Sequence, residues 1–224
     1  MKILSKIIIF IVLLFLIGCK QTANQQQEEK EKTSETSRTE RLINHKTAID
    51  SINTSLNWTE VAAGLWISKN GDLGFKTMED HLEGVSIDRY ITEFYCDGSP
   101  LKSIIDTLSF KYIGSYGRID NFVYKDKNNI YIHHIMFGGG FFCKIPEADV
   151  STFEIIGDYA KDKNYIFGAN GIMDAVDYET FKTCDDCGCF AKDKNGYYFW
   201  GDKFDLNDIT DKETLKIINK LKKL

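Results

Sequence analysis

The chain has 224 residues, a formal net charge of −5 and 43% hydrophobic residues. The part after residue 57 is long enough for one domain with a core of its own, which needs neither metal nor disulfide to fold. The modest negative charge excludes the basic surface that nucleic acids require, so we expect no nucleic-acid partner. Only two prolines and 15 Phe with 11 Tyr favour a β-rich fold with polar turns.

The N-terminus has the pattern of a bacterial lipoprotein signal peptide. Lys2 and Lys6 flank the start of a twelve-residue stretch without charge, Ile7–Gly18. Spanning a bilayer takes about 20 apolar residues, whereas the apolar region of a signal peptide has roughly 7–15. The ending Leu-Ile-Gly-Cys19 is similar to the lipobox, in which the Cys is acylated. Residues 1–18 are therefore expected to be a signal peptide, and Cys19 is expected to carry acyl chains such as palmitate. An uncleaved hydrophobic anchor is the alternative.

Residues 19–57 have the composition of a flexible tether that begins at the lipidated Cys. This segment is rich in Gln, Glu, Lys and Arg and contains no Phe, Tyr or Trp. Ile49, Ile52 and Leu56 recur at helical spacing, which indicates a short helix before the domain. Because Lys20 follows Cys19, similarity to the sorting rule of enteric bacteria favours the outer membrane in a host that has one. The expected location is the cell envelope, with the membrane as a partner through the lipid anchor.

Three near copies of one phrase occupy residues 122–131, 159–167 and 190–199. Each places Lys-Asp-Lys-Asn between short aromatic or β-branched runs, which predicts a β-hairpin and its turn. The Asp can accept from backbone N–H groups two residues on, and the Asn tolerates the left-handed conformation of a tight hairpin. We expect soluble structural tips, and a binding role for the tips is the alternative. The turn residues are Asp126 and Asn128, Asp162 and Asn164, and Asp193 and Asn195.

A second phrase alternates with the first and predicts short helical turns. It reads Asp-x-x-Ser/Thr followed by an apolar residue, and an Asp N-cap opens such a turn. Its copies begin at Asp106, Asp149, Asp177 and Asp211. After the last copy, Leu215, Ile218 and Leu221 step along a helix that is expected to cap the array.

Residues 58–224 are thus expected to form one repeat domain of the β-rich (α+β) class. It consists of tandem β-hairpins joined by short helical turns, and it opens with a divergent hairpin turned on Asn70 and Gly71. An open twisted array is favoured over a closed ring, because three or four short units are few for closure.

The lipobox, the three Lys-Asp-Lys-Asn hairpins and the alternating Asp turns together resemble the DKNYY family of bacterial envelope proteins. The resemblance covers Asp106 to Leu215. Tyr165 and the pair Tyr197 and Tyr198 stand where the tyrosines of the family would, whereas residues 129–131 depart from the pattern. The resemblance implies a repeat architecture and supplies no catalytic residues.

The cysteines are the residues with the most specific chemistry. Cys184, Cys187 and Cys189 are close enough in sequence to bind zinc, and Cys96 and Cys143 lie upstream. In an oxidising envelope thiols pair more often than they bind metal, so two disulfides and one free Cys are favoured, with the connectivity left open. A thioredoxin-like reactive Cys187 is disfavoured because no βαβ pattern surrounds it.

His133 and His134 lie in a strand-like run, where neighbouring side chains point to opposite faces. They cannot form one chelate, and structural histidines are expected. A nucleophilic Cys143 served by one of them is the alternative. The glycines at 138–140 lack the Lys of a phosphate loop and predict a turn.

Repetition without a convergent polar site predicts binding rather than catalysis. We expect a non-catalytic module that presents aromatic side chains to a protein or glycan partner, with no cofactor. An envelope redox or zinc-binding protein centred on Cys184–Cys189 is the alternative. A purely structural role through exposed hairpin edges is a third possibility.

Overall fold

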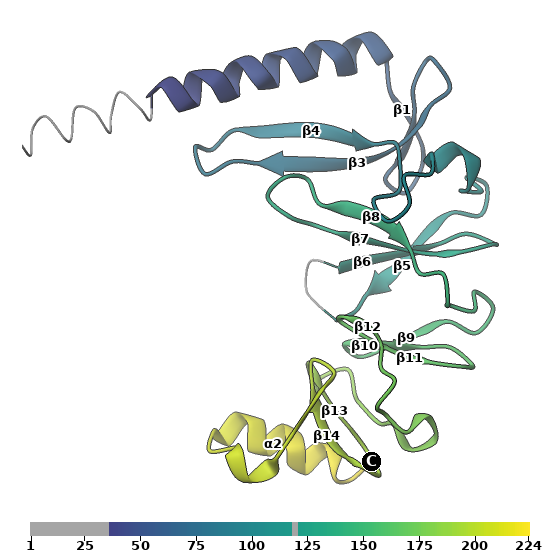
Figure 1. The fold of residues 1–224 in the computed structure, drawn as a ribbon, viewed down its shortest axis with the longest axis vertical. Helices are drawn as coiled ribbons and strands as arrows, with labels where there is room; N and C mark the ends of the chain where they lie inside the picture. Colours follow the sequence, from purple (N-terminus) through teal and green to yellow (C-terminus); the bar gives the residue numbers. More distant parts are fainter. Residues whose placement is uncertain (1–35, 118–120) are drawn as a thin grey trace, which may run out of the picture.

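The structure, a computed structural model, describes residues 36–117 and 121–224. Within these ranges four small antiparallel sheets follow one another along the chain, and a helix lies at each end (Figure 1). Cys19 and the expected signal peptide, residues 1–18, lie outside the described residues. No helix in the described ranges is long and apolar enough to cross a membrane.

A helix over residues 36–56 runs alongside the first sheet (Figure 1). It is longer than the short helix expected there, so much of the segment expected to be a tether is helical. Pairs such as Lys46 Nζ with Asp50 Oδ2, 3.2 Å apart, support the extra turns. The helix is fixed to the sheet because Asn53 Nδ2 donates to the Asp88 carbonyl at 3.0 Å. It ends at Asn57, whose φ of 48° stops the helical path.

The first sheet contains four strands in chain order. Its middle turn lies at Asn70 and Gly71, as predicted, and the φ of 80° at Gly71 suits glycine. Beside this sheet, the rings of Trp58 and Tyr90 stack with centroids 4.3 Å apart. The strands are β1 (Thr59–Ala62), β2 (Leu65–Ile67), β3 (Leu73–Asp80) and β4 (Ser86–Ile91), and the 3-10 helix η1 (Leu101–Ser103) follows.

Each of the three repeated hairpin phrases forms two paired strands of a later sheet. The second sheet contains β5 (Lys111–Ser115), β6 (Asn121–Lys125), β7 (Ile130–His134) and β8 (Phe141–Lys144). The third contains β9 (Glu154–Ile156), β10 (Tyr159–Lys161), β11 (Ile166–Gly168) and β12 (Gly171–Ile172). The fourth contains β13 (Phe190–Asp193), β14 (Gly196–Phe199) and β15 (Asp202–Phe204). In the fourth sheet the strand before the hairpin shrinks to a single bridge between Lys182 and Lys192.

Helices begin at two of the four predicted Asp caps, and single hydrogen-bonded turns follow Asp106 and Asp149. Asp177 caps η2 (Tyr178–Thr180), and Asp211 caps α2 (Lys212–Leu221) by accepting from Thr214 N at 2.7 Å. The element η3 (Leu206–Asp208) lies just before α2. Ile218 and Leu221 of α2 are completely buried, and this covers the end of the last sheet.

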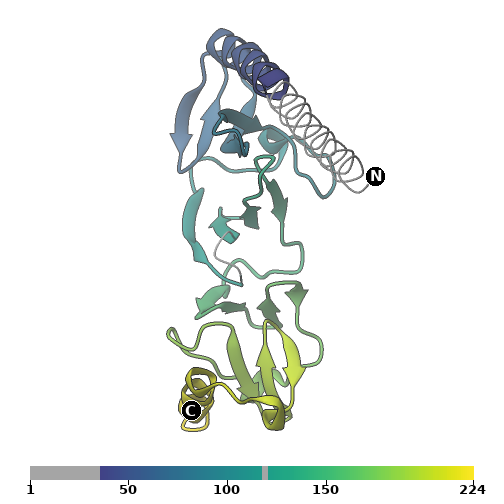
Figure 2. The ribbon, with the colours of Figure 1, turned by 90° about the vertical axis from the view of Figure 1, so that its left-hand side faces the viewer.

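The core lies between successive sheets, which are stacked along the long axis of the molecule (Figure 2). In the second sheet, alternation places Val123 in the cluster shared with the third sheet and Tyr124 against the cluster shared with the first. The first cluster is rich in aromatic rings, and Phe75 stacks on Phe142 with centroids 4.5 Å apart. The first and last sheets lie at opposite ends (Figure 2). The predicted fold class, a β-rich open array with a C-terminal capping helix, is confirmed.

Candidate functional site

A carboxylate lies under each repeated hairpin turn and ties it to the turn that enters the same sheet; Asp126 and Asp162 are buried, and Asp193 is partly buried. Asp162 is only 2% exposed. Its Oδ1 accepts from the backbone N–H groups of Asn164 and Tyr165 at 2.7 and 2.8 Å. Its Oδ2 accepts from Asp149 N at 2.6 Å. Three backbone donors thus compensate the burial of one charge. We call this arrangement a carboxylate clasp.

The same clasp recurs in the second and fourth sheets. Asp126 accepts from the N–H groups of Asn128, Asn129 and Asp106, and Asp193 accepts from those of Asn195, Gly196 and Asp177. Tyrosine hydroxyls add a fourth donor in these two copies, from Tyr131 at 2.7 Å and from Tyr198 at 3.0 Å. At the matching position the third sheet has Phe167, which offers no hydroxyl.

The predicted left-handed conformation of the turn asparagines is wrong. The non-glycine residues with positive φ in the described ranges are Asn57 and Trp200, so Asn128, Asn164 and Asn195 have negative φ. The carboxylate closes each turn by accepting from the second and third residues after it, which ordinary backbone angles permit.

The repeated lysines and hydroxyls complete the clasp. Lys163 N donates to Thr152 Oγ1 at 3.0 Å, and Lys163 Nζ lies 2.7 Å from Asp149 Oδ2. The Lys163 ammonium, with the hydroxyls of Ser151 and Thr152, holds the pKa of Asp149 well below its usual value. Equivalent pairs lie in the other two sheets, between Lys127 and Asp106 and between Lys194 and Asp177. These polar groups therefore hold each hairpin turn to the segment that enters its sheet.

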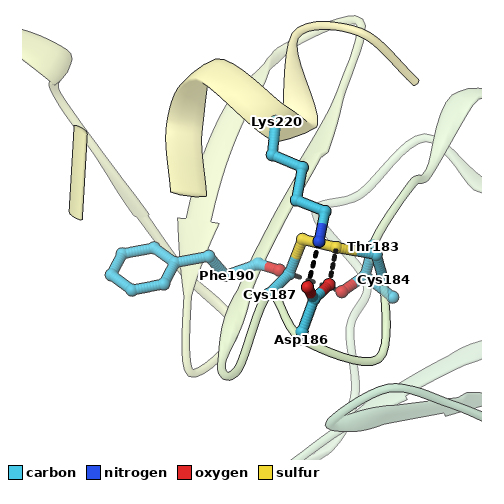
Figure 3. The surroundings of a disulfide bond; sticks show 6 residues. All are labelled: Thr183, Cys184, Asp186, Cys187, Phe190 and Lys220. Carbon is cyan, nitrogen blue, oxygen red and sulfur yellow. Dashed lines mark hydrogen bonds and ion pairs between the residues drawn. A yellow bond between two sulfur atoms is a disulfide. The ribbon is translucent and has the colours of Figure 1, made fainter. Parts of the chain in front are cut away.

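The five downstream cysteines fall into two disulfides and one free thiol. Cys96, after β4, pairs with Cys143 of β8, so this bond links the first sheet to the second across 47 positions. Cys184 pairs with Cys187 in the loop between η2 and β13 (Figure 3). Cys189 is free.

The loop that the Cys184–Cys187 disulfide closes packs against α2. Lys220 of α2 forms an ion pair with Asp186, and its ammonium lowers the pKa of that carboxyl (Figure 3). Phe190 N, at the start of β13, donates to the Cys187 carbonyl at 3.3 Å. Cys187 is completely buried against α2. This geometry suits a structural crosslink.

The arrangement does not favour the zinc alternative. Ligand atoms of Cys184, Asp186 and Cys187 lie within 4.8 Å of one another, but sulfurs joined in a disulfide offer no thiolate to a metal. Cys189 lies apart from them, with its Sγ 3.4 Å from Asp158 Oδ2. Burial and this carboxylate raise the pKa of Cys189 to about 12, so it is a neutral thiol near pH 7.

The two histidines of β7 are in different environments, as their positions predict. His133 is buried, and its ring centroid lies 4.8 Å from that of Phe75. His134 instead contacts the Asn121 side chain. The hypothesis of a Cys143 nucleophile is wrong, because Cys143 is in a disulfide. The glycine run lies in the loop between β7 and β8, where Gly139 and Gly140 have φ of 91° and 74°, so it forms the predicted turn.

A pocket of about 410 Å³ lies between the first and second sheets. Its lining includes the rings of Phe75, Phe122 and Tyr124. The other lining side chains include Met78, Ile135, Lys76, Thr77, Asp80 and Asp88. His133 also lines it and is 4% exposed, yet its Nε2 has no hydrogen-bond partner in the part of the chain that the structure describes. Burial lowers the pKa of His133, so the ring is neutral near pH 7. A pocket with aromatic walls and a few polar and charged side chains in its lining, among them Lys76 and Asp88, is suited to binding.

Sequence reasoning missed this pocket because its walls come from β3, β6 and β7, which meet only in the folded array. The one available signal is the alternation of Phe122 and Tyr124 with Val123, which marks a strand face of aromatic side chains.

Comparison with known proteins gives a family match that includes the three sheets with carboxylate clasps. The family model of the DKNYY family matches residues 88–224, more than half of the chain. The chain belongs to the DKNYY family. The predicted family is thus confirmed, and the match extends beyond the range expected from the motifs. In this DKNYY protein the matched region begins in β4, after the turn of the first sheet. No curated protein and no solved structure matches the chain.

Proposed function

We propose that this DKNYY protein is a lipid-anchored protein of the bacterial envelope whose array is a non-catalytic binding module for a protein or glycan partner. The observation that supports binding is the aromatic-walled pocket between the first two sheets. The repeated polar side chains, by contrast, hydrogen-bond within their own clasps. They are therefore engaged in structure and do not converge on a point where a substrate could react.

The anchoring part of the proposal rests on the Leu-Ile-Gly-Cys pattern that ends at Cys19. A lipobox Cys with several acyl chains holds a protein at the membrane, because each buried methylene contributes ~0.8 kcal/mol. Lys20 favours the outer membrane in a host with two membranes. Intact mass and incorporation of labelled palmitate test this part. Cys19→Ala is expected to abolish both the added mass of the acyl chains and the incorporation of label. A wild-type protein without acyl chains would contradict it.

Capture from solubilised envelope tests the binding part. The acylated protein is expected to retain a partner, and Phe122→Ala is expected to lose it because a pocket wall is removed. Phe199→Ala is the matched control, since Phe199 is a partly exposed ring on the fourth sheet. Protease or glycosidase treatment of the extract distinguishes a protein from a glycan. Failure to retain anything above an unanchored control would contradict the proposal.

A further inference from the structure

Three segments that are distant in sequence meet at one end of the first two sheets. The beginning of the described helix lies at the β3–β4 turn, because Arg38 Nε is 2.6 Å from Glu83 Oε1. The β7–β8 turn lies beside the same hairpin, because Asp80 N donates to the Phe137 carbonyl at 2.9 Å. Figure 1 shows the start of the helix and both turns on the same side of the molecule.

The two turns expose large apolar side chains. Leu82 is 81% exposed, Phe137 65% and Met136 53%. Met78 and Ile135 are exposed next to them. Single exposed apolar residues are common on protein surfaces, but several gathered at one end of two neighbouring sheets indicate an interaction surface. We call these five residues the apolar tip.

Two of the acidic groups beside the apolar tip are paired with basic side chains, whereas Asp80 accepts from the Ser86 hydroxyl. Glu83 is paired with Arg38, and Glu79 lies 2.7 Å from Arg89 and 2.9 Å from His81. The acidic groups therefore repel a lipid headgroup layer less than isolated carboxylates would.

We propose that Leu82, Met136 and Phe137 insert into the surface of the membrane to which Cys19 anchors the chain, so that the array stands on that membrane through its first two sheets. This inference rests on the lipid anchor proposed above. Only residues 20–35 separate Cys19 from the described helix, whose beginning lies at the apolar tip. A segment of that length reaches at most about 55 Å, so the anchor keeps the membrane near this end. A lipid surface is therefore the occupant that the anchor itself supplies.

Site-specific labelling tests the inference. Leu82→Cys and Phe137→Cys are introduced separately into the full acylated protein bound to phosphatidylcholine vesicles. Leu108→Cys is the matched control, because Leu108 is 96% exposed and neighbours Ser109, which bonds to the β6–β7 turn at the other end of β7. The three cysteine variants are also made in the unacylated mature chain that carries Cys19→Ser, and these proteins are labelled in lipid-free buffer. The native thiol of Cys189 reacts slowly because its pKa is raised.

We expect a water-soluble maleimide to react about tenfold more slowly with positions 82 and 137 on vesicles than in buffer, as burial of an apolar side chain implies. Position 108 should react equally in both. Equal rates at all three positions would overturn the inference. Slowing that depends on protein density, or that needs an envelope protein rather than lipid, would also overturn it.

Loss of the anchor and loss of the apolar contact give different results. If intact mass shows no acyl group on Cys19, the proposed anchor fails. The unacylated variants are then mixed with the same vesicles. Slowing at 82 and 137 alone would support membrane insertion without an anchor, and unchanged rates would overturn both proposals.

Discussion

The first sheet and the three later sheets fix their middle turns in different ways. In the later sheets a carboxylate accepts from the turn itself and from the segment that enters the sheet, as Asp162 does. In the first sheet Ser68 occupies the turn, and its Oγ accepts from Asn70 N at 3.2 Å and Asp72 N at 3.1 Å. The entering segment contributes through Leu56, at the end of the helix, whose carbonyl accepts from Lys69 N at 2.8 Å.

The difference shows what the Asp of the repeated Lys-Asp-Lys-Asn motif does in this chain. A carboxylate can join two segments at once, so each later sheet depends on its entering turn. Ser68 accepts only locally, and the attachment of the first sheet relies instead on the helix, the aromatic cluster and the Cys96–Cys143 bond. The family match begins after the Ser68 turn, which agrees with this division.

Removing a clasp carboxylate should have the largest effect. Asp162→Ala leaves three backbone donors without their acceptor, and we expect the free energy of unfolding to fall by about 3–5 kcal/mol. Urea denaturation followed by circular dichroism measures it. Asp208→Ala, at an exposed carboxylate, is the control and should change stability by less than about 0.5 kcal/mol. Equal losses would contradict a special role for the clasp.

Removing the bond between the first two sheets should cost slightly less. The double variant Cys96→Ser with Cys143→Ser should lose about 2–4 kcal/mol, because the bond constrains a long loop of the unfolded chain. The Cys184–Cys187 bond joins residues only three positions apart. The double variant Cys184→Ser with Cys187→Ser should therefore lower the free energy of unfolding by no more than about 2 kcal/mol. Thiol counting on the oxidised protein should find one free thiol in the wild type. The reverse order of losses would contradict this view of the first sheet.

Ser68→Ala should have a smaller effect than loss of a clasp. The variant removes the hydroxyl that accepts from two N–H groups of the turn. We expect the free energy of unfolding to fall by about 1 kcal/mol. Thermal unfolding would show it as a modest fall in Tm, with Ser51→Ala on the exposed face of the helix as the control. A loss as large as that of Asp162→Ala would mean that the first turn is held in the same way as the others.

Lys163→Met should have the smallest effect near neutral pH. The side chain is largely exposed, and ion pairs of this kind contribute little to stability. Its effect should emerge in acid. Because Lys163 lowers the pKa of Asp149 in the folded state, the carboxylate stabilises the fold above its unfolded pKa of about 3.8, and this stability is lost as the pH falls through the folded value.

The variant should therefore begin to unfold at a higher pH than the wild type, in the range below about pH 5. An acid titration followed by circular dichroism measures the shift. Lys182→Met, at an exposed lysine on the same array, is the control. An unchanged acid transition would show that Lys163 does not contribute through Asp149.

The sequence by itself predicted the β-rich class, the three hairpins, the Asp caps and the terminal helix. These features depend on contacts between residues two to five positions apart, such as Asp162 with Asn164, and on strand alternation. Such contacts form within one turn, so residue types and spacing suffice to identify them. The turn asparagines were the exception, because a carboxylate can close the turn without a left-handed residue.

Only the tertiary structure decided how distant segments meet. It paired Cys96 with Cys143 and left Cys189 beside Asp158, and it extended the helix by docking it on the first sheet. It also brought β3, β6 and β7 together around His133 and joined the β7–β8 turn to β3 through the Asp80–Phe137 hydrogen bond. These arrangements depend on how successive sheets stack. Stacking is governed by nonlocal packing of large side chains, which the spacing of residues along the chain does not specify.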